Sequence, residues 1–287
     1  MLRLPAPAKL NLFLRITGRR ADGYHELQTL FQLLDWGDEL ELHGLEKGRL
    51  ERAGHVPGVP AEADLSLRAA RLLQERAQAL GRPWAGARIT LHKAIPLGSG
   101  LGGASSDAAT VLLGLNALWG SGFSRAELTA LGARLGADVP VFVQGDSAWA
   151  EGVGERLSPL ALGERHYVLL LPGAGLATRE MFADPELRRD AAPWSMALPE
   201  ALPALENDFL PLALKRSEVL RDAFKALQSL GPARMSGSGS TLFLEAMNET
   251  HANELTTALK NNYNVRAVRG VDRSPVYGAL AAQTLSM

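Results

Sequence analysis

A glycine-rich segment from Pro96 to Asp107, here called the glycine loop, has the composition of a loop that binds a phosphate group. Glycine adopts positive φ and lets backbone amides approach an anion without a Cβ atom in the way. An apolar helix pattern follows, and the N-terminus of a helix adds unpaired amides and a partial positive charge. Ser105 and Ser106 can donate hydroxyl hydrogen bonds to the same phosphates.

Other interpretations of the glycine loop differ in what must accompany it. Gly98 to Gly103 satisfies the dinucleotide pattern G-x-G-x-x-G, but no ribose-binding Asp or Glu ends a strand about 20 residues later, because Gly120 to Ser124 leads into another helix. A Walker loop needs a lysine after its last glycine, and none follows Gly103. A connection that binds no ligand remains open on the glycines alone.

Composition narrows the class of protein. The chain has 287 residues, so a norm of about 150 residues per domain predicts two lobes. A net charge of −1 argues against a nucleic-acid partner, which would require concentrated Lys and Arg. The chain has no cysteine, which excludes disulfides and thiolate catalysis, and its six histidines are too scattered for a local metal motif.

The N-terminus and the hydropathy pattern give no sign of a membrane partner. Prolines and Lys9 interrupt the place where a signal peptide would need an apolar core. No apolar run approaches the roughly 20 residues that span a bilayer. We therefore expect a cytoplasmic protein.

The elements that would position a site begin with strands. Residues 10–16 alternate between apolar and other side chains, which predicts a half-buried strand. The same period of two places Lys9 and Asn11 together on the side away from the aliphatic face, where both could reach a ligand. Further strands are expected at 24–35 and 39–43, after the turn signal Asp22-Gly23.

Helix and strand signals continue through the middle of the chain. Asp64 would cap a helix over 65–80, and Ser124 and Glu127 would form the capping box of another. A strand at 88–93 leads into the glycine loop, and a helix over 108–118 follows it. Residues 139–143 are predicted to be extended and buried, because a residue before proline is pushed out of the helical region.

The second half of the chain mixes helices with strand pairs. Residues 151–163, with repeated Gly, Ser and Pro, are the best candidate for a junction between lobes. Residues 184–203 are expected to be irregular, and Ser236 to Ser240, here called the glycine-serine turn, connects two short strands. The other expected elements are a strand at 167–171, helices at 178–182, 212–230 and 251–261, and a last strand at 265–268. This mixture predicts an α+β fold.

Three motifs occur in an order that resembles a known family. Pro7-Ala-Lys-Leu-Asn-Leu12, the glycine loop and the glycine-serine turn are similar to motifs of the GHMP kinases, the galactokinase, homoserine kinase, mevalonate kinase and phosphomevalonate kinase family. The resemblance implies a two-lobed α+β GHMP kinase fold with the active site in the cleft between lobes. Residues 1–155 would form the ATP-binding lobe and residues 156–287 the substrate-side lobe.

Further segments narrow the resemblance within the family. Arg20 to His25, Gly136 to Phe142 and Glu151 to Glu155 are similar to members that act on a sugar alcohol carrying a cytidine diphosphate group, in the non-mevalonate route to isoprenoid precursors. The resemblance implies that ATP phosphorylates the 2-hydroxyl of this small molecule. Mg²⁺ is expected as a second cofactor, because it bridges nucleotide phosphates, and its protein ligands stay unassigned.

The resemblance also implies residue roles. Asp138 would accept the hydroxyl proton, and Lys9 beside it would stabilise the transferred charge. The predicted ATP-binding residues are Pro96, Leu97, Gly98, Ser99, Gly100, Leu101, Gly102, Gly103, Ala104, Ser105 and Ser106. The predicted substrate-binding residues are Asn11, Tyr24, His25, Thr178, Phe182, Gly237 and Ser238. Tyr24 and Phe182 would sandwich the cytosine while His25 hydrogen-bonds its polar edge.

Each role has a structural alternative when the resemblance is set aside. Asp138 would more often be a turn or cap residue, Lys9 a solvated surface cation and Phe182 a core side chain. Nothing in the spacing brings Lys9 and Asp138 together. Strict alternation also points Tyr24 and His25 to opposite faces, so their strand would begin after His25 or be distorted there.

Other functions are compatible with the same motifs. The nearest is another small-molecule alcohol kinase of the same family. A non-catalytic sensor that binds ATP and a sugar through the same fold is an alternative of a different class. A dinucleotide-dependent oxidoreductase is the most distant.

Overall fold

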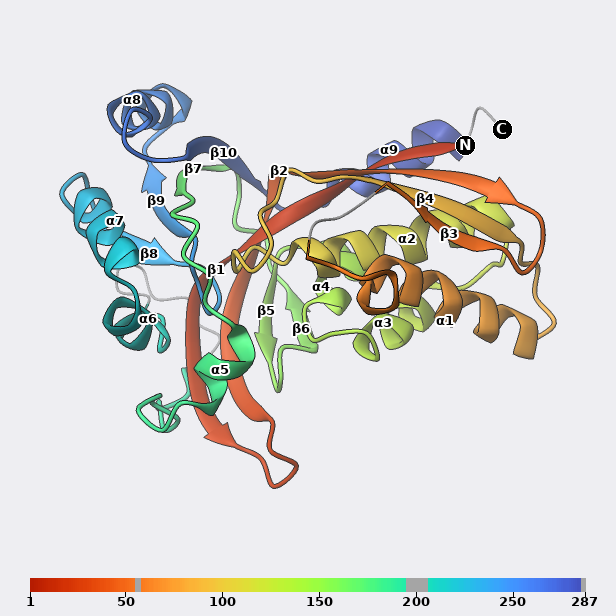
Figure 1. Cartoon of the computed structure of the whole chain (residues 1–287), viewed down its shortest axis with the longest axis horizontal. Helices are drawn as coiled ribbons and strands as arrows, with labels where there is room; N and C mark the ends of the chain where they lie inside the picture. The colour runs from red at the N-terminus through yellow and green to blue at the C-terminus, as the bar shows by residue number, and fades with distance from the viewer. Residues whose placement is uncertain (55–57, 195–205, 285–287) are drawn as a thin grey trace.

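Two long antiparallel strands form the centre of the protein. The computed structural model describes residues 1–54, 58–194 and 206–284. Within them, β1 (Leu2–Arg19) pairs with β2 (His25–Leu45) along almost its whole length (Figure 1). The two strands predicted at 24–35 and 39–43 are therefore one. The prediction of a half-buried first strand is wrong, because residues 6–16 are all buried and other elements pack on both faces.

The remaining strands extend this pair into one mixed sheet. In the described residues, its main path runs in the order β3-β4-β2-β10-β7-β9-β8, and β1, β5 and β6 pair beside β2. The pairs are antiparallel except for β3 with β4. The bounds of the strands are β3 Leu50–Ala53, β4 Gly86–His92, β5 Ala148–Glu151, β6 Arg156–Pro159, β7 Arg165–Leu170, β8 Arg234–Met235, β9 Leu242–Ala246 and β10 Val265–Val271.

Helices of the first half lie together beside β1, β2 and β4 (Figure 1). They are α1 (Leu65–Ala79), α2 (Gly103–Trp119), α3 (Arg125–Ala133) and α4 (Val139–Gln144), with a short 3₁₀ helix at Ala61–Ala63. The predicted caps are confirmed, since Asp64 accepts from two α1 amides and Ser124 forms a capping box with Glu127. The prediction of an extended segment at 139–143 is wrong. Pro140 lies in the first turn of α4, where its missing N–H costs no helical hydrogen bond.

Helices of the second half pack on one face of β7, β8 and β9 (Figure 1). They are α5 (Thr178–Ala183), α6 (Leu210–Arg216), α7 (Glu218–Gln228) and α8 (Glu249–Leu259). The single helix predicted at 212–230 is two, because Ser217 is extended and its side chain caps α7 instead. The last helix, α9 (Pro275–Thr284), was not predicted, and it packs against β1.

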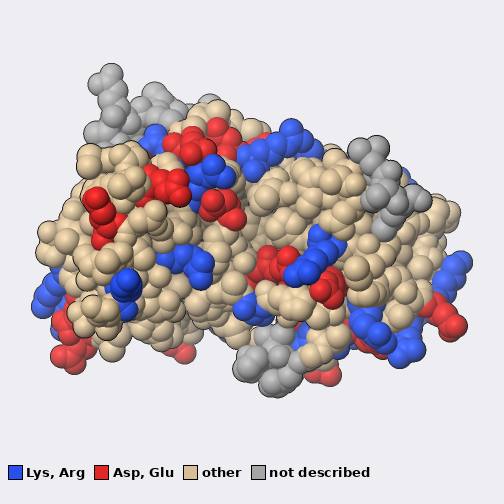
Figure 2. Space-filling model, turned by 90° about the horizontal axis from the view of Figure 1, so that it is seen from above, with Lys and Arg blue, Asp and Glu red and all other residues tan. Residues whose placement is uncertain are grey.

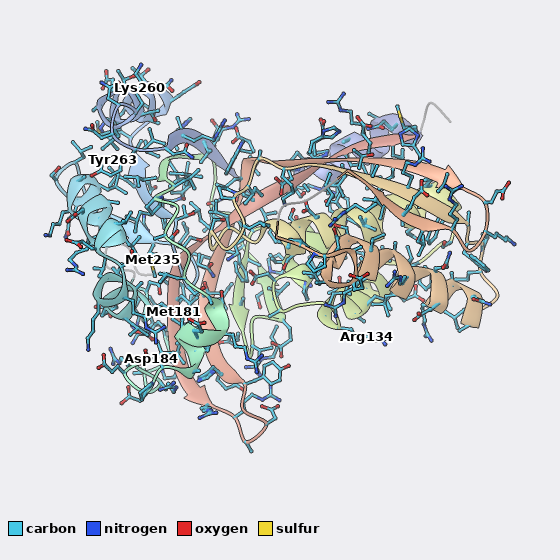
Figure 3. All side chains as sticks on the ribbon, in the orientation of Figure 1. Arg134, Met181, Asp184, Met235, Lys260 and Tyr263 are labelled. Atoms are coloured by element: carbon cyan, nitrogen blue, oxygen red, sulfur yellow. The ribbon has the colours of Figure 1, made fainter. Side chains whose placement is uncertain are left out.

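Apolar side chains form separate clusters in the two halves. One cluster joins β1, β2 and β4 to α1, α2, α3 and α4, and also includes Val276 of α9. A second joins the strands and helices of the C-terminal half and contains Met181 and Met235 (Figure 3). Trp149, Tyr167 and Phe243 belong to a smaller cluster that also contains side chains of β1 and β2. The α+β class is confirmed, whereas the lobe boundary at residue 155 stays a prediction.

Charge is spread over the surface. On the face seen in Figure 2, Lys and Arg lie interspersed with Asp and Glu instead of forming one basic patch. No helix among the described residues has the length and apolar character needed to cross a bilayer.

Candidate active site

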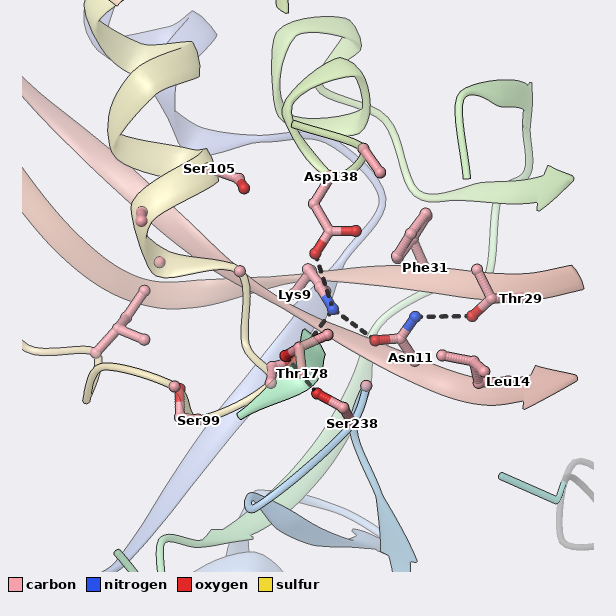
Figure 4. A pocket seen from close by; sticks show the side chains of 18 of the residues that line it. Lys9, Asn11, Leu14, Thr29, Phe31, Ser99, Ser105, Asp138, Thr178 and Ser238 are labelled. Carbon is pink, nitrogen blue, oxygen red and sulfur yellow. Dashed lines mark hydrogen bonds and ion pairs between the residues drawn. The ribbon is translucent and has the colours of Figure 1, made fainter. Parts of the chain in front are cut away.

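A cleft of about 360 Å³ lies where the central strands, the glycine loop, the start of α4, α5 and the glycine-serine turn meet (Figure 4). Most of the residues predicted for the site line this cleft. They are Lys9, Asn11, Pro96, Leu97, Gly98, Ser99, Gly100, Gly102, Gly103, Ala104, Ser105, Asp138, Thr178, Phe182, Gly237 and Ser238.

The backbone of the glycine loop takes the conformation that its composition predicts. Gly98, Gly100 and Gly102 have φ of 65°, 79° and 75°. At Gly100 the glycine-serine turn is also very close, because a Cβ atom there would lie 2.2 Å from the carbonyl oxygen of Ser236. Glycine is therefore required at Gly100 for conformation and for space.

The carbonyl groups of the glycine loop are bound by other elements. The amide of Thr241 donates to the Ser99 carbonyl at 3.0 Å, and the amide of Lys9 donates to the Leu101 carbonyl at 3.0 Å. The Gly100 carbonyl accepts from Lys9 Nζ at 3.0 Å and from Ser236 Oγ at 2.9 Å. Within the described part of the chain, no amide from residues 100–105 donates to a protein acceptor. These amides are thus available to an anion in the cleft.

A lysine and a carboxylate face each other beside the loop (Figure 4). Lys9 Nζ lies 3.4 Å from Asp138 Oδ2, and the side chains are 2% and 34% exposed. Asp138 lies in a turn at the N-cap position of α4, as its structural alternative predicted, but its side chain accepts no capping hydrogen bond. The alternative of a solvated cation fails for Lys9, which is buried. The pair combines a proton acceptor with a fixed positive charge.

Asn11 orients the lysine. Lys9 Nζ donates to Asn11 Oδ1 at 2.5 Å, as expected for two residues on the same side of a strand. Asn11 Nδ2 in turn donates to Thr29 Oγ1 of β2 at 2.9 Å. The chain of hydrogen bonds fixes the Asn11 amide so that its oxygen faces the ammonium.

On the side of the cleft opposite Asp138, the wall is formed by α5 and the glycine-serine turn. The hydroxyls of Thr178 and Ser238 are hydrogen-bonded to one another at 2.7 Å. Asn207 Nδ2 donates to the carbonyls of Met235 and Gly237, each at 2.8 Å, and so fixes the turn. Both predicted hydroxyl groups therefore reach the cleft from separate elements.

Aromatic side chains lie at one end of the cleft. The rings of His25 and Phe182 are stacked with centroids 4.9 Å apart, and Phe182 also contacts Phe209 edge-on. Arg189 Nε donates to His25 Nε2 at 3.1 Å, which leaves the proton of the neutral imidazole on Nδ1. Burial, and then the positive charges of Arg189 and Arg19, lower the pKa of His25 below its usual value.

Four predicted residues do not line the cleft. Tyr24 precedes β2 and is 64% exposed, while His25 is the first residue of the strand. Beginning the strand at His25 places Tyr24 outside it, so strand alternation no longer separates the two side chains. Leu101 and Ser106 belong to the glycine loop, but their side chains are buried and do not line the cleft. The roles of all predicted site residues stay predictions.

Several cleft residues were missed by sequence reasoning, among them Thr29, Phe31 and Lys93. Lys9 Nζ lies 5.4 Å from the centre of the Phe31 ring. A polar Thr29 among buried apolar strand residues was a usable signal. Arg189 could not be found, because its segment has no regular pattern.

The described residues contain no group of three or more side chains of His, Cys, Asp or Glu suited to a metal ion. Mg²⁺ does not need such a group, since it is commonly held by one or two carboxylates, waters and nucleotide phosphates. The structure therefore gives no dedicated protein cage, and we assign no residue to the metal.

Comparisons with known proteins agree with this geometry. Residues 64–146 match the model of the GHMP kinases N terminal domain, and residues 195–265 match that of the GHMP kinases C terminal domain. A 4-diphosphocytidyl-2-C-methyl-D-erythritol kinase of Xanthomonas axonopodis pv. citri is 48% identical over 97% of this chain and 94% of that protein. The kinase of the same name from Halorhodospira halophila is 47% identical over 96% of each chain.

Solved structures of kinases also resemble this fold. A crystal structure of 4-(cytidine 5'-diphospho)-2C-methyl-D-erythritol kinase has a TM-score of 0.80 and 37% identity, and covers 94% of this chain and 100% of that one. A homoserine kinase from Cytophaga hutchinsonii has a TM-score of 0.62 at 18% identity and covers 95% of each chain. The second likeness concerns the fold alone.

Proposed function

Because the chain belongs to the GHMP kinase family, we propose that it transfers the γ-phosphoryl group of ATP to the 2-hydroxyl of 4-diphosphocytidyl-2-C-methyl-D-erythritol. This reaction serves the non-mevalonate synthesis of isoprenoid precursors. The observation that supports it best is the Lys9–Asp138 pair, which faces the cleft beside a glycine loop with unoccupied amides.

The chemistry follows from the arrangement of this pair. As the substrate oxygen attacks the γ-phosphorus, Asp138 takes the hydroxyl proton, and the bond to the β-phosphate oxygen breaks to release ADP. Lys9, held by Asn11 and the Gly100 carbonyl, stabilises negative charge on the attacking and transferred oxygens. The loop amides bind the nucleotide phosphates. Mg²⁺, when bound to those phosphates, supplies further charge neutralisation.

The substrate lies between the pair and the aromatic end of the cleft. Phe182 and Tyr24 bind the two faces of the cytosine, and the Nδ1 proton of His25 is directed to its edge. Binding of the substrate then requires Tyr24, which is exposed in the free protein, to move onto the base. Thr178, Ser238 and Gly237 contact the sugar alcohol and diphosphate.

The test is an ATP-turnover assay on the purified protein with a panel of acceptors. We expect the cytidyl sugar alcohol to be phosphorylated at least about a hundredfold more efficiently than mevalonate or homoserine, because only the first can fill the aromatic end. Preference for mevalonate or homoserine would instead identify another alcohol kinase of the family. Binding of ATP without turnover of any acceptor would identify a sensor.

A further inference from the structure

A buried charge cluster lies behind the glycine loop. Lys93, which follows β4, donates from Nζ to Asp38 Oδ2 of β2 and to Asp107 Oδ2 in the second turn of α2, the latter at 2.6 Å. The side chains of Lys93, Asp38 and Asp107 are 20%, 0% and 4% exposed. Neither carboxylate lines the cleft, so the two acids are not placed to touch a ligand.

Asp38 also binds the backbone that enters the glycine loop. Its Oδ1 accepts from the amides of Ala94 and Ile95 at 2.5 and 2.8 Å, immediately before Pro96. Its other oxygen lies close to the far end of the loop, since a Cβ atom at Gly103 would be 3.3 Å from Asp38 Oδ2. One carboxylate of the central strand thus contacts the start of the loop directly.

The end of the loop is attached through the lysine. Asp107 is four residues beyond Gly103, the first residue of α2, and Lys93 joins it to Asp38. Inside the loop, the carbonyls are bound by Lys9, Ser236 and Thr241. The cluster therefore determines where the loop begins and ends, while other elements determine its middle.

If the cluster only stabilised the fold, burying its charges would gain little free energy of folding. Two buried carboxylates share one ammonium, and a buried ion pair often contributes no more to stability than apolar side chains of the same volume. Burial raises the pKa of Asp107 to about 7, with Lys93 opposing and Asp38 adding to this effect. A geometric role explains why charges are used, because the carboxylates bind backbone amides and an ammonium in fixed directions.

We propose that Asp38, Lys93 and Asp107 position the glycine loop for the nucleotide phosphates by fixing its two ends to β2. Asp38 and Asp107 are positioning residues, acting through the loop backbone without touching the ligand. The proposal rests on the proposed function only in taking an adenine nucleotide as the ligand of the loop.

The test compares Asp107→Leu with Asp107→Asn. Leucine removes the Asp107 oxygen that accepts from Lys93, while the Asp38 carboxylate still balances the Lys93 charge. Asparagine keeps an oxygen that can accept the hydrogen bond. We expect Asp107→Leu to weaken ADP binding and raise the ATP KM about tenfold, with the KM of the cytidyl substrate within about twofold of wild type. Asp107→Asn should bind ADP within about twofold of wild type. Calorimetric titration with ADP alone gives the first readout.

Two controls distinguish failure of this proposal from failure of the proposed function. Asp35→Asn changes an exposed carboxylate on the same strand, paired with Arg269, and should leave ADP binding unchanged. Wild-type ADP affinity in Asp107→Leu, or an equal rise of both KM values, would overturn the proposal. If wild-type protein binds no ADP, the proposed function fails instead.

A measurement on the wild-type protein covers the case in which Asp107→Leu does not fold. The amides of Ala94 and Ile95 should exchange hydrogen slowly before any nucleotide is added, because Asp38 already binds them. Fast exchange that slows only on addition of ADP would contradict the proposal.

Discussion

The two ends of the cleft are built in different ways. At the phosphate end, the glycine loop presents backbone amides, and its carbonyls are bound by Lys9, Ser236 and Thr241. At the other end, which we propose binds the base, Phe182 lines the cleft and stacks on His25, and Tyr24 is exposed nearby in sequence. Backbone groups held from several sides are pre-organised, whereas side chains on a turn and a short helix can be rearranged or replaced.

This difference separates what the family shares from what a member selects. Phosphate groups are common to every ATP-dependent kinase, so a rigid backbone site suits them. The acceptor molecule differs between members, and a side-chain site can change with few substitutions. Lys9 and Asp138 lie between the two ends, where the reacting atoms of both ligands meet in the proposed reaction.

The largest effect on turnover is expected at Asp138, between the two ends of the cleft. Asp138→Asn removes the proton acceptor but keeps the shape of the side chain, so kcat should fall by a factor of about 10² to 10⁴. ADP affinity should stay within about threefold of wild type, because the loop amides are untouched. Steady-state kinetics and ADP titration measure both.

Asp146→Asn is the matched control for Asp138→Asn. Asp146 lies just beyond α4 and pairs with Arg125 outside the cleft, so this variant should keep wild-type turnover. Undiminished kcat in Asp138→Asn would remove the base from the proposed mechanism.

At the phosphate end, Gly100→Ala should damage the backbone site more than Gly98→Ala. Both residues have positive φ, but a Cβ atom would meet the Ser236 carbonyl at Gly100 and open space at Gly98. We expect Gly100→Ala to destabilise the fold by about 2 to 3 kcal/mol and to raise the ATP KM, with a loss near 1 kcal/mol for Gly98→Ala. Thermal unfolding and ATP kinetics give the comparison, and equal losses would show that the contact with the glycine-serine turn is unimportant.

At the base end, Phe182→Ala should change substrate binding without affecting ATP. Loss of one stacking face costs about 1 to 3 kcal/mol, so the KM of the cytidyl substrate should rise roughly 10- to 100-fold. The ATP KM measured in the same variant is the internal control. Equal increases in both would mean that Phe182 serves mainly to pack against Phe209.

The smallest effect concerns pH and the buried cluster. The native pKa of Asp107, about 7, lies above its usual value of 3.8, so the folded state favours the protonated form. The resulting stabilisation is present at acidic pH and is lost as pH rises through 7. Asp107→Asn removes the charge, and its melting temperature should exceed that of wild type by a few degrees at pH 8 and by less at pH 5. If the difference in melting temperature between Asp107→Asn and wild type were the same at both pH values, the raised pKa of Asp107 would be contradicted.

Local signals in the sequence predicted local structure well. The caps at Asp64 and Ser124, the conformation of the glycine loop and the common side of Lys9 and Asn11 all depend on neighbouring residues. The extended prediction at 139–143 failed because proline fits the first turn of a helix as well as it fits an extended segment. Local chemistry alone did not decide between the two.

Contacts between distant segments could not be predicted from spacing. Lys9 meets Asp138, and Asp38 meets Lys93, only because of how β1, β2 and the helices pack. The resemblance to GHMP kinases named Lys9 and Asp138 but not the buried cluster. Arg189 lies in a segment without periodicity, so nothing indicated its hydrogen bond to His25.

The length of β2 has a consequence for which molecules the protein can accept. The strand β2 carries His25 beside Phe182, Thr29 and Phe31 in the cleft and Asp38 beside the glycine loop. At about 3.3 Å per residue, it separates His25 from Asp38 by roughly 40 Å of extended backbone. Deleting one residue within a regularly paired part of it would turn the following side chains to the opposite face, as far as the next register shift in its pairing with β1. A change in acceptor length is therefore accommodated more easily at the turn at 20–24 or in the C-terminal half than within a regularly paired part of this strand.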